Sequence, residues 1–101
     1  MDQDKMTQRL ADLVWEPLEV IEKQLAPWGI EVTYRGEHSV GVRNKYLDLM
    51  TVIDAHDDPN NRAVCLAFVT AGQYWTKVYP NLQPLVNREW GRRTKEQKAN
   101  Q

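Results

Sequence analysis

Side chains that bind metal ions gather in one short stretch of the sequence, Asp54, His56, Asp57 and Asp58. Carboxylates and imidazoles are common protein ligands of divalent cations. A calcium-binding loop, however, needs oxygen ligands at alternate positions, a glycine and a distal glutamate, and a zinc site needs further histidine or cysteine. The stretch has neither pattern. We therefore interpret it as a solvated acidic turn, and we expect no metal ion and no cofactor.

Covalent catalysis needs a nucleophile beside a base. Cys65 is the only cysteine and lies within the apolar run 63–69, which is typical of a small buried side chain in a reducing compartment. His38 follows Gly36 in a loop, and we expect it to lie far from His56. No serine or cysteine is placed to pair with a histidine, and no glycine-rich phosphate loop is present. The sequence predicts a protein that is not an enzyme.

Positive charge is concentrated at the C-terminal end of the chain. Residues 81–101 hold five bases and two acids, whereas residues 1–27 hold six acids and three bases. Cations beside aromatic rings are typical of a surface that follows a phosphate backbone while bases stack on the rings. Nucleic-acid binding is therefore the alternative function, through a basic set made of Arg88, Arg92, Arg93, Lys95 and Lys98.

The predicted order of elements, a helix, several strands and a helix, resembles double-stranded-RNA-binding domains in outline. Where that family has a dense run of lysines at the start of its second helix, this chain has Asn81-Leu82-Gln83-Pro84. The same order resembles the small chaperone-type domains that dimerise and cradle secreted effectors. Both resemblances are topological, and no diagnostic motif identifies a family.

Residues 4–26 have the apolar spacing of an amphipathic helix. The recurring apolar positions are Met6, Leu10, Leu13, Val14, Leu18, Ile21 and Leu25. Because this stripe keeps its phase across Pro17, we predict one continuous kinked helix, with a helix that restarts at Pro17 as the alternative. Trp15 lies on the polar side of the helix, so it is either covered by a loop or exposed to a partner.

Beyond Gly29 the apolar period changes to two, which indicates strands. The pattern predicts three consecutive strands at residues 30–35, 39–43 and 46–54. For the apolar side chains of the first two strands to lie on the same face of the sheet, Val32 must lie opposite Val42 and Tyr34 opposite Val40.

Residues 59–71 allow two interpretations. Asp58 as cap, Pro59 at the first position and Gly72 at the end would suit a helix. A strand buried on both faces also appears as a short apolar run, and we favour a strand. Residues 74–79 then form a fifth strand or a continuation of the fourth.

The last predicted helix starts at Asn81. It either ends near Gly91 or continues as a basic ridge. We predict one domain at residues 1–91 and a basic tail at 92–101, for which helix and disorder both remain open.

Together these elements predict a two-layer α+β domain: an N-terminal helix, an antiparallel meander of four or five strands and a C-terminal helix. With 42% hydrophobic and 27% charged residues, the chain is expected to fold rather than to remain disordered. One face of the predicted sheet has no helix to cover its apolar side chains, which include Met50, Val52, Ala63, Cys65 and Ala67. This face should be buried in a homodimer or against another protein.

The sequence thus favours a small non-enzymatic protein-interaction module of the inhibitor, adaptor or chaperone type. Aromatic residues and arginine dominate binding energy where they lose contact with water. The partner-binding set is therefore Trp15, Trp75, Tyr79, Arg88 and Arg92. The start of the chain lacks the pattern of a signal peptide, and no apolar run could span a membrane, so we expect a cytoplasmic protein.

Overall fold

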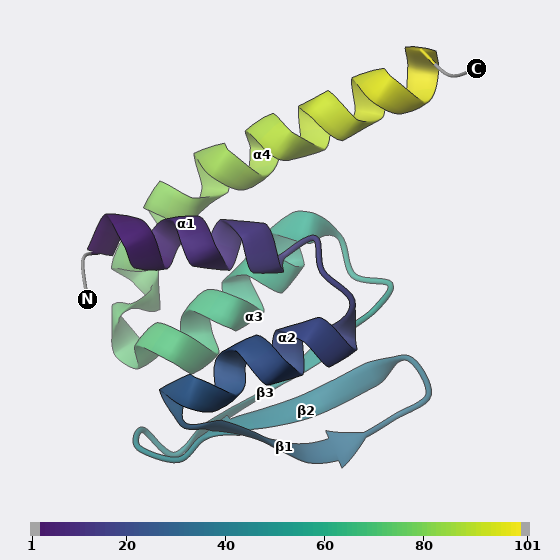
Figure 1. The fold of residues 1–101 in the computed structure, drawn as a ribbon. Coiled ribbons are helices and arrows are strands. Elements are labelled where there is room, and N and C mark those ends of the chain that lie inside the picture. The colour runs from purple at the N-terminus through teal and green to yellow at the C-terminus, as the bar shows by residue number, and fades with distance from the viewer. Residues whose placement is uncertain (1–2, 100–101) are drawn as a thin grey trace.

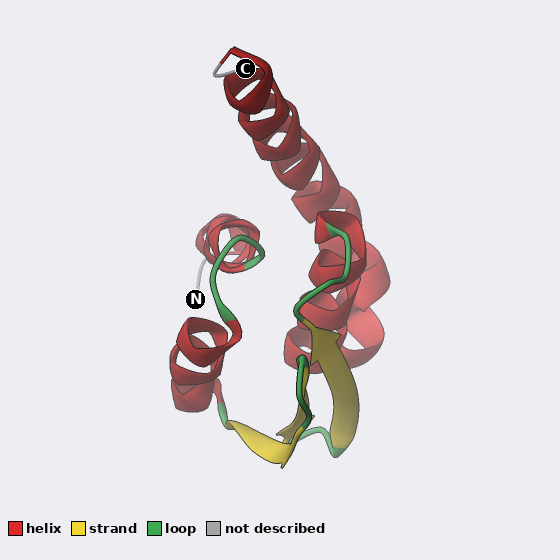
Figure 2. Ribbon diagram, turned by 90° about the vertical axis from the view of Figure 1, so that its right-hand side faces the viewer, coloured by secondary structure: helices red, strands yellow, loops and turns green. Residues whose placement is uncertain are grey.

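The computed structural model describes residues 3–99, with the side chains of residues 5–98. Its elements are α1 (Gln3–Leu13), α2 (Leu18–Leu25), the 3-10 helix η1 (Ala26–Trp28), β1 (Ile30–Arg35), β2 (Ser39–Asn44), β3 (Leu49–Asp54), α3 (Pro59–Ala71), the 3-10 helix η2 (Gly72–Tyr74) and α4 (Trp75–Ala99). The strands form one antiparallel meander in the order β1-β2-β3, with the helices on one side of it (Figures 1 and 2). The α+β class is confirmed, but the sheet has three strands rather than four or five. No described helix is long and apolar enough to cross a membrane.

The N-terminal helix is broken at Pro17, so the prediction of one continuous helix was wrong and the alternative is confirmed. Pro17 is the N-cap of α2 and has an extended backbone. Proline cannot donate a backbone hydrogen bond, and it disfavours helical geometry at Glu16. The chain leaves α1 through a turn in which the Glu16 amide donates to the Leu13 carbonyl at 3.1 Å. As a result α2 packs against β1, while α1 contacts α3 and α4.

The β1–β2 register is partly as predicted. Val32 lies opposite Val42, but Tyr34 lies opposite Gly41 and Arg35 takes the place opposite Val40. A bulge between Val32 and Tyr34 inserts one residue, and one residue is enough to move a side chain to the other face of a strand. Tyr34 therefore points away from the helices.

The third strand begins at Leu49 rather than Tyr46, because the buried Asn44 side chain organises the preceding turn. Its Oδ1 accepts hydrogen bonds from the amides of Tyr46 at 2.9 Å and Leu47 at 3.2 Å. Its Nδ2 donates to the Val69 carbonyl at 2.9 Å, which joins the sheet to the last turns of α3. One buried amide thus fixes both the turn and the packing of a helix on the sheet.

Residues 59–71 form a helix, so the prediction of a fourth strand was wrong. Asp58 Oδ1 accepts a hydrogen bond from the Asn61 amide at 2.8 Å, Pro59 occupies the first turn, and Gly72 ends the helix with a φ of 62°. α3 lies between the sheet and the other helices, in contact with β2, β3, α1 and α4. A helix packed between two layers needs only a narrow polar stripe, so residues 63–69 form a continuous apolar run that resembles a buried strand.

The predicted fifth strand and the helix start at Asn81 were also wrong, since α4 begins at Trp75. Pro80 and Pro84 lie inside α4, and both are exposed, so water can bind the carbonyls that they leave without a helical partner. α4 does not end at Gly91, where a side chain would meet no other atom within 4 Å. It continues to Ala99, and its C-terminal half projects from the body of the protein (Figure 1).

Arg62 in α3 joins two chain reversals. Its Nη1 donates to the carbonyls of Val14 at 3.1 Å and Glu16 at 3.0 Å, and its Nη2 donates to those of Asp54 at 3.2 Å and Ala55 at 3.3 Å. Its Nε is buried without a hydrogen-bond partner among the described residues. Burial lowers the pKa of the guanidinium, although the charges of Asp57 and Asp54 partly oppose this shift.

Replacement of Arg62 should destabilise the fold. Arg62→Met removes the side-chain donor from four carbonyls, of which the Asp54 carbonyl keeps the Asp57 amide at 3.3 Å, and we expect a loss of about 2–4 kcal/mol in the free energy of unfolding, measured with urea. The stability of Arg62→Lys should lie between those of the wild type and Arg62→Met, because an ammonium group lacks the planar fork that reaches both pairs of carbonyls. The control is Arg88→Met, at an exposed position, which should change stability by less than about 0.5 kcal/mol. Equal stability of Arg62→Met and Arg88→Met would contradict the proposed role of Arg62.

Candidate functional site

Large apolar side chains are exposed on the side of the sheet that faces away from the helices. Tyr34, Met50 and Val52 are 56%, 59% and 53% exposed. Tyr34 and Val52 both pair with Gly41, one from each neighbouring strand, and Met50 lies on the same face two residues before Val52. We call Tyr34, Gly41, Met50 and Val52 the open face.

Two glycines allow Tyr34 to lie flat along this surface. A Cβ atom at Gly41 would be 3.2 Å from the Tyr34 Cβ, and one at Gly36 would be 2.6 Å from the Tyr34 hydroxyl oxygen. Side chains at these two positions would push the ring away. The bulge in β1 and the two glycines therefore produce a flat apolar platform.

A fixed group of charges borders the platform. Arg43 lies between Glu31 and Met50 in the register of the sheet. Its guanidinium pairs with Asp48 at 2.7 Å and with Glu31 at 3.2 Å. The hydrogen bonds to Asp48 and Glu31 hold the guanidinium in a defined position at this rim. The same bonds, that to Asp48 first, raise the pKa of Arg43.

A separate groove of about 520 Å³ lies between α1 and α4, and it brings together two of the predicted partner-binding residues, Trp15 and Arg88. Trp15 is half-buried in the turn that follows α1. The Arg93 guanidinium lies 4.5 Å from the centre of its ring, and Arg93 Nε donates to Glu89 Oε1 at 2.9 Å. One face of the Trp15 ring is thus already occupied by a cation of the same chain.

The other predicted aromatic residues, Trp75 and Tyr79, lie elsewhere. Both are half-buried and pack against the hydrophobic core from the first turns of α4. The Tyr79 hydroxyl also donates to Asn60 Oδ1 in α3 at 3.4 Å. These two rings hold α4 against the core, and the structure does not bring them together with Trp15.

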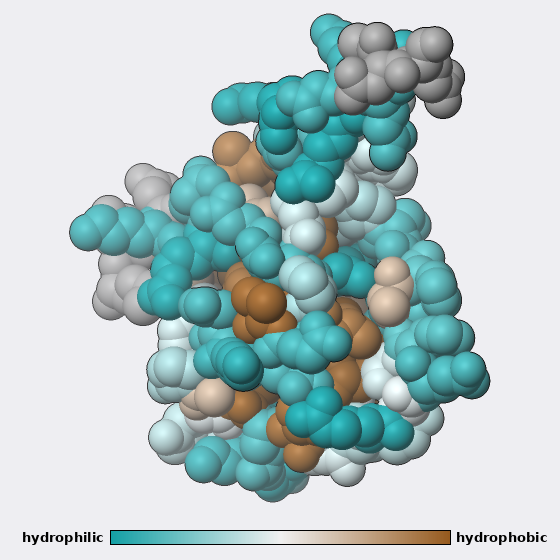
Figure 3. Space-filling model, turned by 45° about the vertical axis from the view of Figure 1, so that its right-hand side comes forward, coloured by the Kyte–Doolittle hydropathy of each residue, from teal (hydrophilic) through white to brown (hydrophobic). Residues whose placement is uncertain are grey.

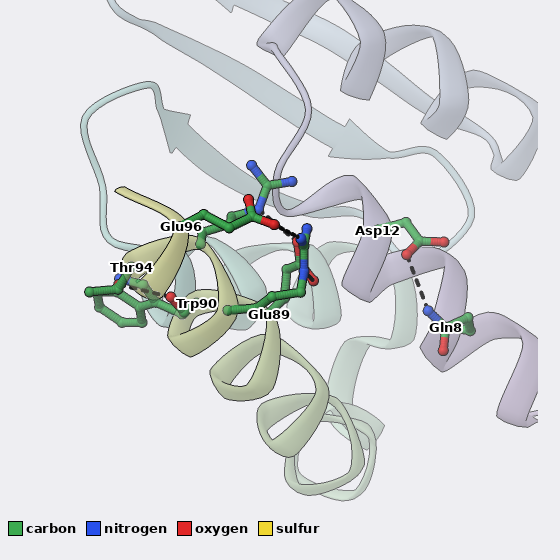
Figure 4. A network of polar contacts seen from close by, with 8 residues as sticks. Gln8, Asp12, Glu89, Trp90, Thr94 and Glu96 are labelled. Carbon is green, nitrogen blue, oxygen red and sulfur yellow. Dashed lines mark hydrogen bonds and ion pairs between the residues drawn. The ribbon is translucent and has the colours of Figure 1, made fainter. Parts of the chain in front are cut away.

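Ion pairs occupy part of the predicted basic surface. Arg92 binds Glu89 and Glu96 within α4, and Figure 4 shows the contact with Glu96. These contacts raise the pKa of Arg92, and the hydrogen bond from Arg92 is the largest cause of a lowered pKa at Glu89. Of the five residues in the predicted basic set, Arg88, Lys95 and Lys98 are those for which the structure shows no ion pair. The end of α4 is hydrophilic on the face seen in Figure 3, whereas hydrophobic side chains reach the surface in the middle of that face.

The two histidines lie together, so the expectation that His38 is far from His56 was wrong. Their ring centres are 4.7 Å apart in an edge-to-face arrangement. The neighbouring acidic side chains stabilise the backbone here. Asp54 Oδ1 accepts a hydrogen bond from the His56 amide at 2.7 Å, and Asp58 caps α3. Within the part of the chain that the structure describes, no group of three or more histidine, cysteine or acidic residues is placed to hold a metal ion.

Sequence reasoning found part of the open face and missed the rest. The alternation in residues 46–54 correctly placed Met50 and Val52 on the uncovered side. Ala63 and Ala67, expected beside them, are instead buried in α3. Tyr34 was missed because a bulge has no clear sequence signal, although a glycine at position 41 in a strand is one hint.

The ion pairs of Glu89 should make stability depend on acid pH. The pKa of Glu89 is lowered in the folded protein, so its ionised form contributes stability above the ordinary value of 4.5, and this contribution is lost as the pH falls through the folded pKa. We expect Glu89→Gln to be less stable than the wild type at pH 7 and equally stable at pH 2–3, as measured by urea unfolding. Glu16→Gln, at an exposed position with no side-chain ion pair in the structure, is the control. A constant difference between Glu89→Gln and wild type at every pH would contradict the ion-pair explanation.

No protein-family model, curated protein or solved structure matches this chain.

Proposed function

We propose that this protein acts by binding another protein through the open face of its sheet. The observation that carries the proposal is the exposure of Tyr34, Met50 and Val52 side by side on a face without helices. Among the described residues, five of the seven exposed large hydrophobic side chains belong to the sheet or to its β2–β3 turn: Tyr34, Tyr46, Leu47, Met50 and Val52. Clustered exposed apolar residues with a polar rim are typical of protein-interaction sites.

The size of the open face limits the kind of complex that it supports. Three strands of about six residues present roughly 300 Å² in projection, from a spacing of about 4.8 Å and a rise of about 3.4 Å per residue. A standard interface buries about 800 Å² on each partner. A contact restricted to this face therefore belongs to the transient class, and a longer-lived complex must also use the neighbouring β2–β3 turn.

The proposed role is that of an inhibitor, adaptor or chaperone, in which the protein works by occupying a surface of its partner. A second copy of the chain is one such partner, because a two-fold axis brings the same apolar platform to both sides of an interface. Ala63, Cys65 and Ala67 belong to α3 and not to the sheet, so a dimer of this kind would form through the open face alone.

Nucleic-acid binding through α4 has less support. Arg92 and Arg93 are engaged with Glu89 and Glu96, so phosphate groups would have to compete with carboxylates for them. Anisotropy with short DNA and RNA at two salt concentrations tests this alternative, because affinity from phosphate contacts falls steeply with salt.

A charge on the platform should abolish partner binding without unfolding the protein. We expect Val52→Lys and Met50→Lys to remain folded, since both side chains are more than half exposed, and to lose binding at least tenfold. Self-association is measured by sedimentation velocity, and heterologous binding by calorimetry with the partner found by crosslinking. Gln83→Lys, exposed in α4, adds the same charge away from the sheet and the β2–β3 turn and should bind as the wild type does.

The proposal is wrong if the partner binds Val52→Lys and the wild type equally well, or if the wild type stays monomeric and crosslinks to no other protein. Binding lost in both Val52→Lys and Gln83→Lys would also count against it, because a general effect of charge would then explain the loss.

A further inference from the structure

We propose that His38 and His56 form a two-histidine site for a borderline divalent cation such as Cu²⁺, Ni²⁺ or Zn²⁺. These are the only histidines of the chain, and they are 18 residues apart in sequence. Their rings nevertheless meet with centres 4.7 Å apart. A metal ion bound by two imidazole nitrogens at about 2.0–2.1 Å from each requires rings at this kind of separation.

The backbone holds the two histidines in place. The Ala55 amide donates to the His38 carbonyl at 2.7 Å, which ties the β1–β2 loop to the turn after β3. The His56 amide is fixed by Asp54 Oδ1, also at 2.7 Å. Both side chains therefore start from anchored positions, and only rotation about the side-chain bonds is needed to point a nitrogen of each ring at one ion.

The imidazole nitrogens are available as ligands. Among the described residues, the one polar contact of either ring is His38 Nε2 with Glu37 Oε1, at 3.7 Å, which is too long for a hydrogen bond. Both histidines are exposed, so an ion can enter from solvent and keep water in its remaining positions. Sites of this open kind bind more weakly than the closed four-ligand sites that hold structural zinc.

The charges around the pair favour a cation. His38 lines a hollow of about 500 Å³ together with Glu16, Glu19, Glu37 and Arg62. Glu16, Glu19 and Glu37 give this hollow negative charge on the His38 side of the pair, whereas the Arg62 guanidinium is bound to backbone carbonyls. Asp54 and Asp57 lie on the histidine turn itself and add to the negative potential. Imidazole ligands select Cu²⁺, Ni²⁺ and Zn²⁺, whereas Mg²⁺ and Ca²⁺ prefer oxygen.

The test is titration of the full untagged chain with CuCl₂, NiCl₂, ZnCl₂ and MgCl₂ in separate calorimetric experiments. We expect one site, with Cu²⁺ bound most tightly and Mg²⁺ not bound. His38→Asn and His56→Asn should each weaken binding at least tenfold, and the double variant should abolish it. Lowering the pH should weaken binding, because protons compete with the metal for the imidazoles. At a metal concentration one hundred times the dissociation constant, the ratio of folded to unfolded protein should rise about one hundredfold.

Cys65→Ser is the matched control, since Cys65 is the only thiol of the chain; this variant should bind as the wild type does. A second readout locates the ion without mutation: Cu²⁺ should broaden the ring proton signals of both histidines before any others in the NMR spectrum. Absence of binding, binding that survives in the double histidine variant, or binding that Cys65→Ser removes would each overturn the proposal. The open face plays no part in this site, so Val52→Lys should bind the metal unchanged, and either proposal can fail without the other.

Discussion

The contact on which the fold most depends is made by the guanidinium of Arg62. Pro17 ends the first helix early, and the carbonyls of Val14 and Glu16 then lack helical partners. The carbonyls of Asp54 and Ala55 lie where the sheet ends and lack ladder partners. A single planar side chain donates to all four, so one residue of α3 holds two reversals of the chain in place. The cost is a cation partly removed from water and a buried Nε without a partner among the described residues, which local carbonyl dipoles and nearby acids offset.

The order of the layers explains why no described helix covers the outer side of the sheet. α3 is enclosed between the sheet and α1 and α4, so the described helices are all used on one side. The core contains Leu10, Ile21, Ile53, Leu66 and Leu82, each fully buried. No described element remains to cover Tyr34, Met50 and Val52. The exposed platform thus follows from the order of the layers and not from one unusual residue.

Much of the architecture follows from local sequence, and the failures have definite physical causes. Period-two alternation correctly predicted the strands at Ile30 and Ser39 and the pairing of Val32 with Val42. It failed for residues 59–71, because a helix packed between two layers lacks the broad polar stripe of a surface helix; there the cap at Asp58 and the glycine at position 72 were the better signals. Contacts between residues far apart in sequence, such as His38 with His56, depend on the three-dimensional fold and cannot be predicted from the spacing of residues along the chain. The bulge at Tyr34 likewise depends on how two strands meet.

The long last helix combines two environments in one element. Val78, Leu82 and Val86 are buried against the core, whereas every residue from Gly91 to Lys98 is exposed. Beyond Gly91 the backbone hydrogen bonds are supported mainly by helix propensity and by pairs such as Arg92 with Glu96, which are individually weak. Amide protons of this outer segment should therefore exchange with solvent through local fraying, at a free energy well below that of global unfolding, while those near Leu82 exchange only when the whole domain opens.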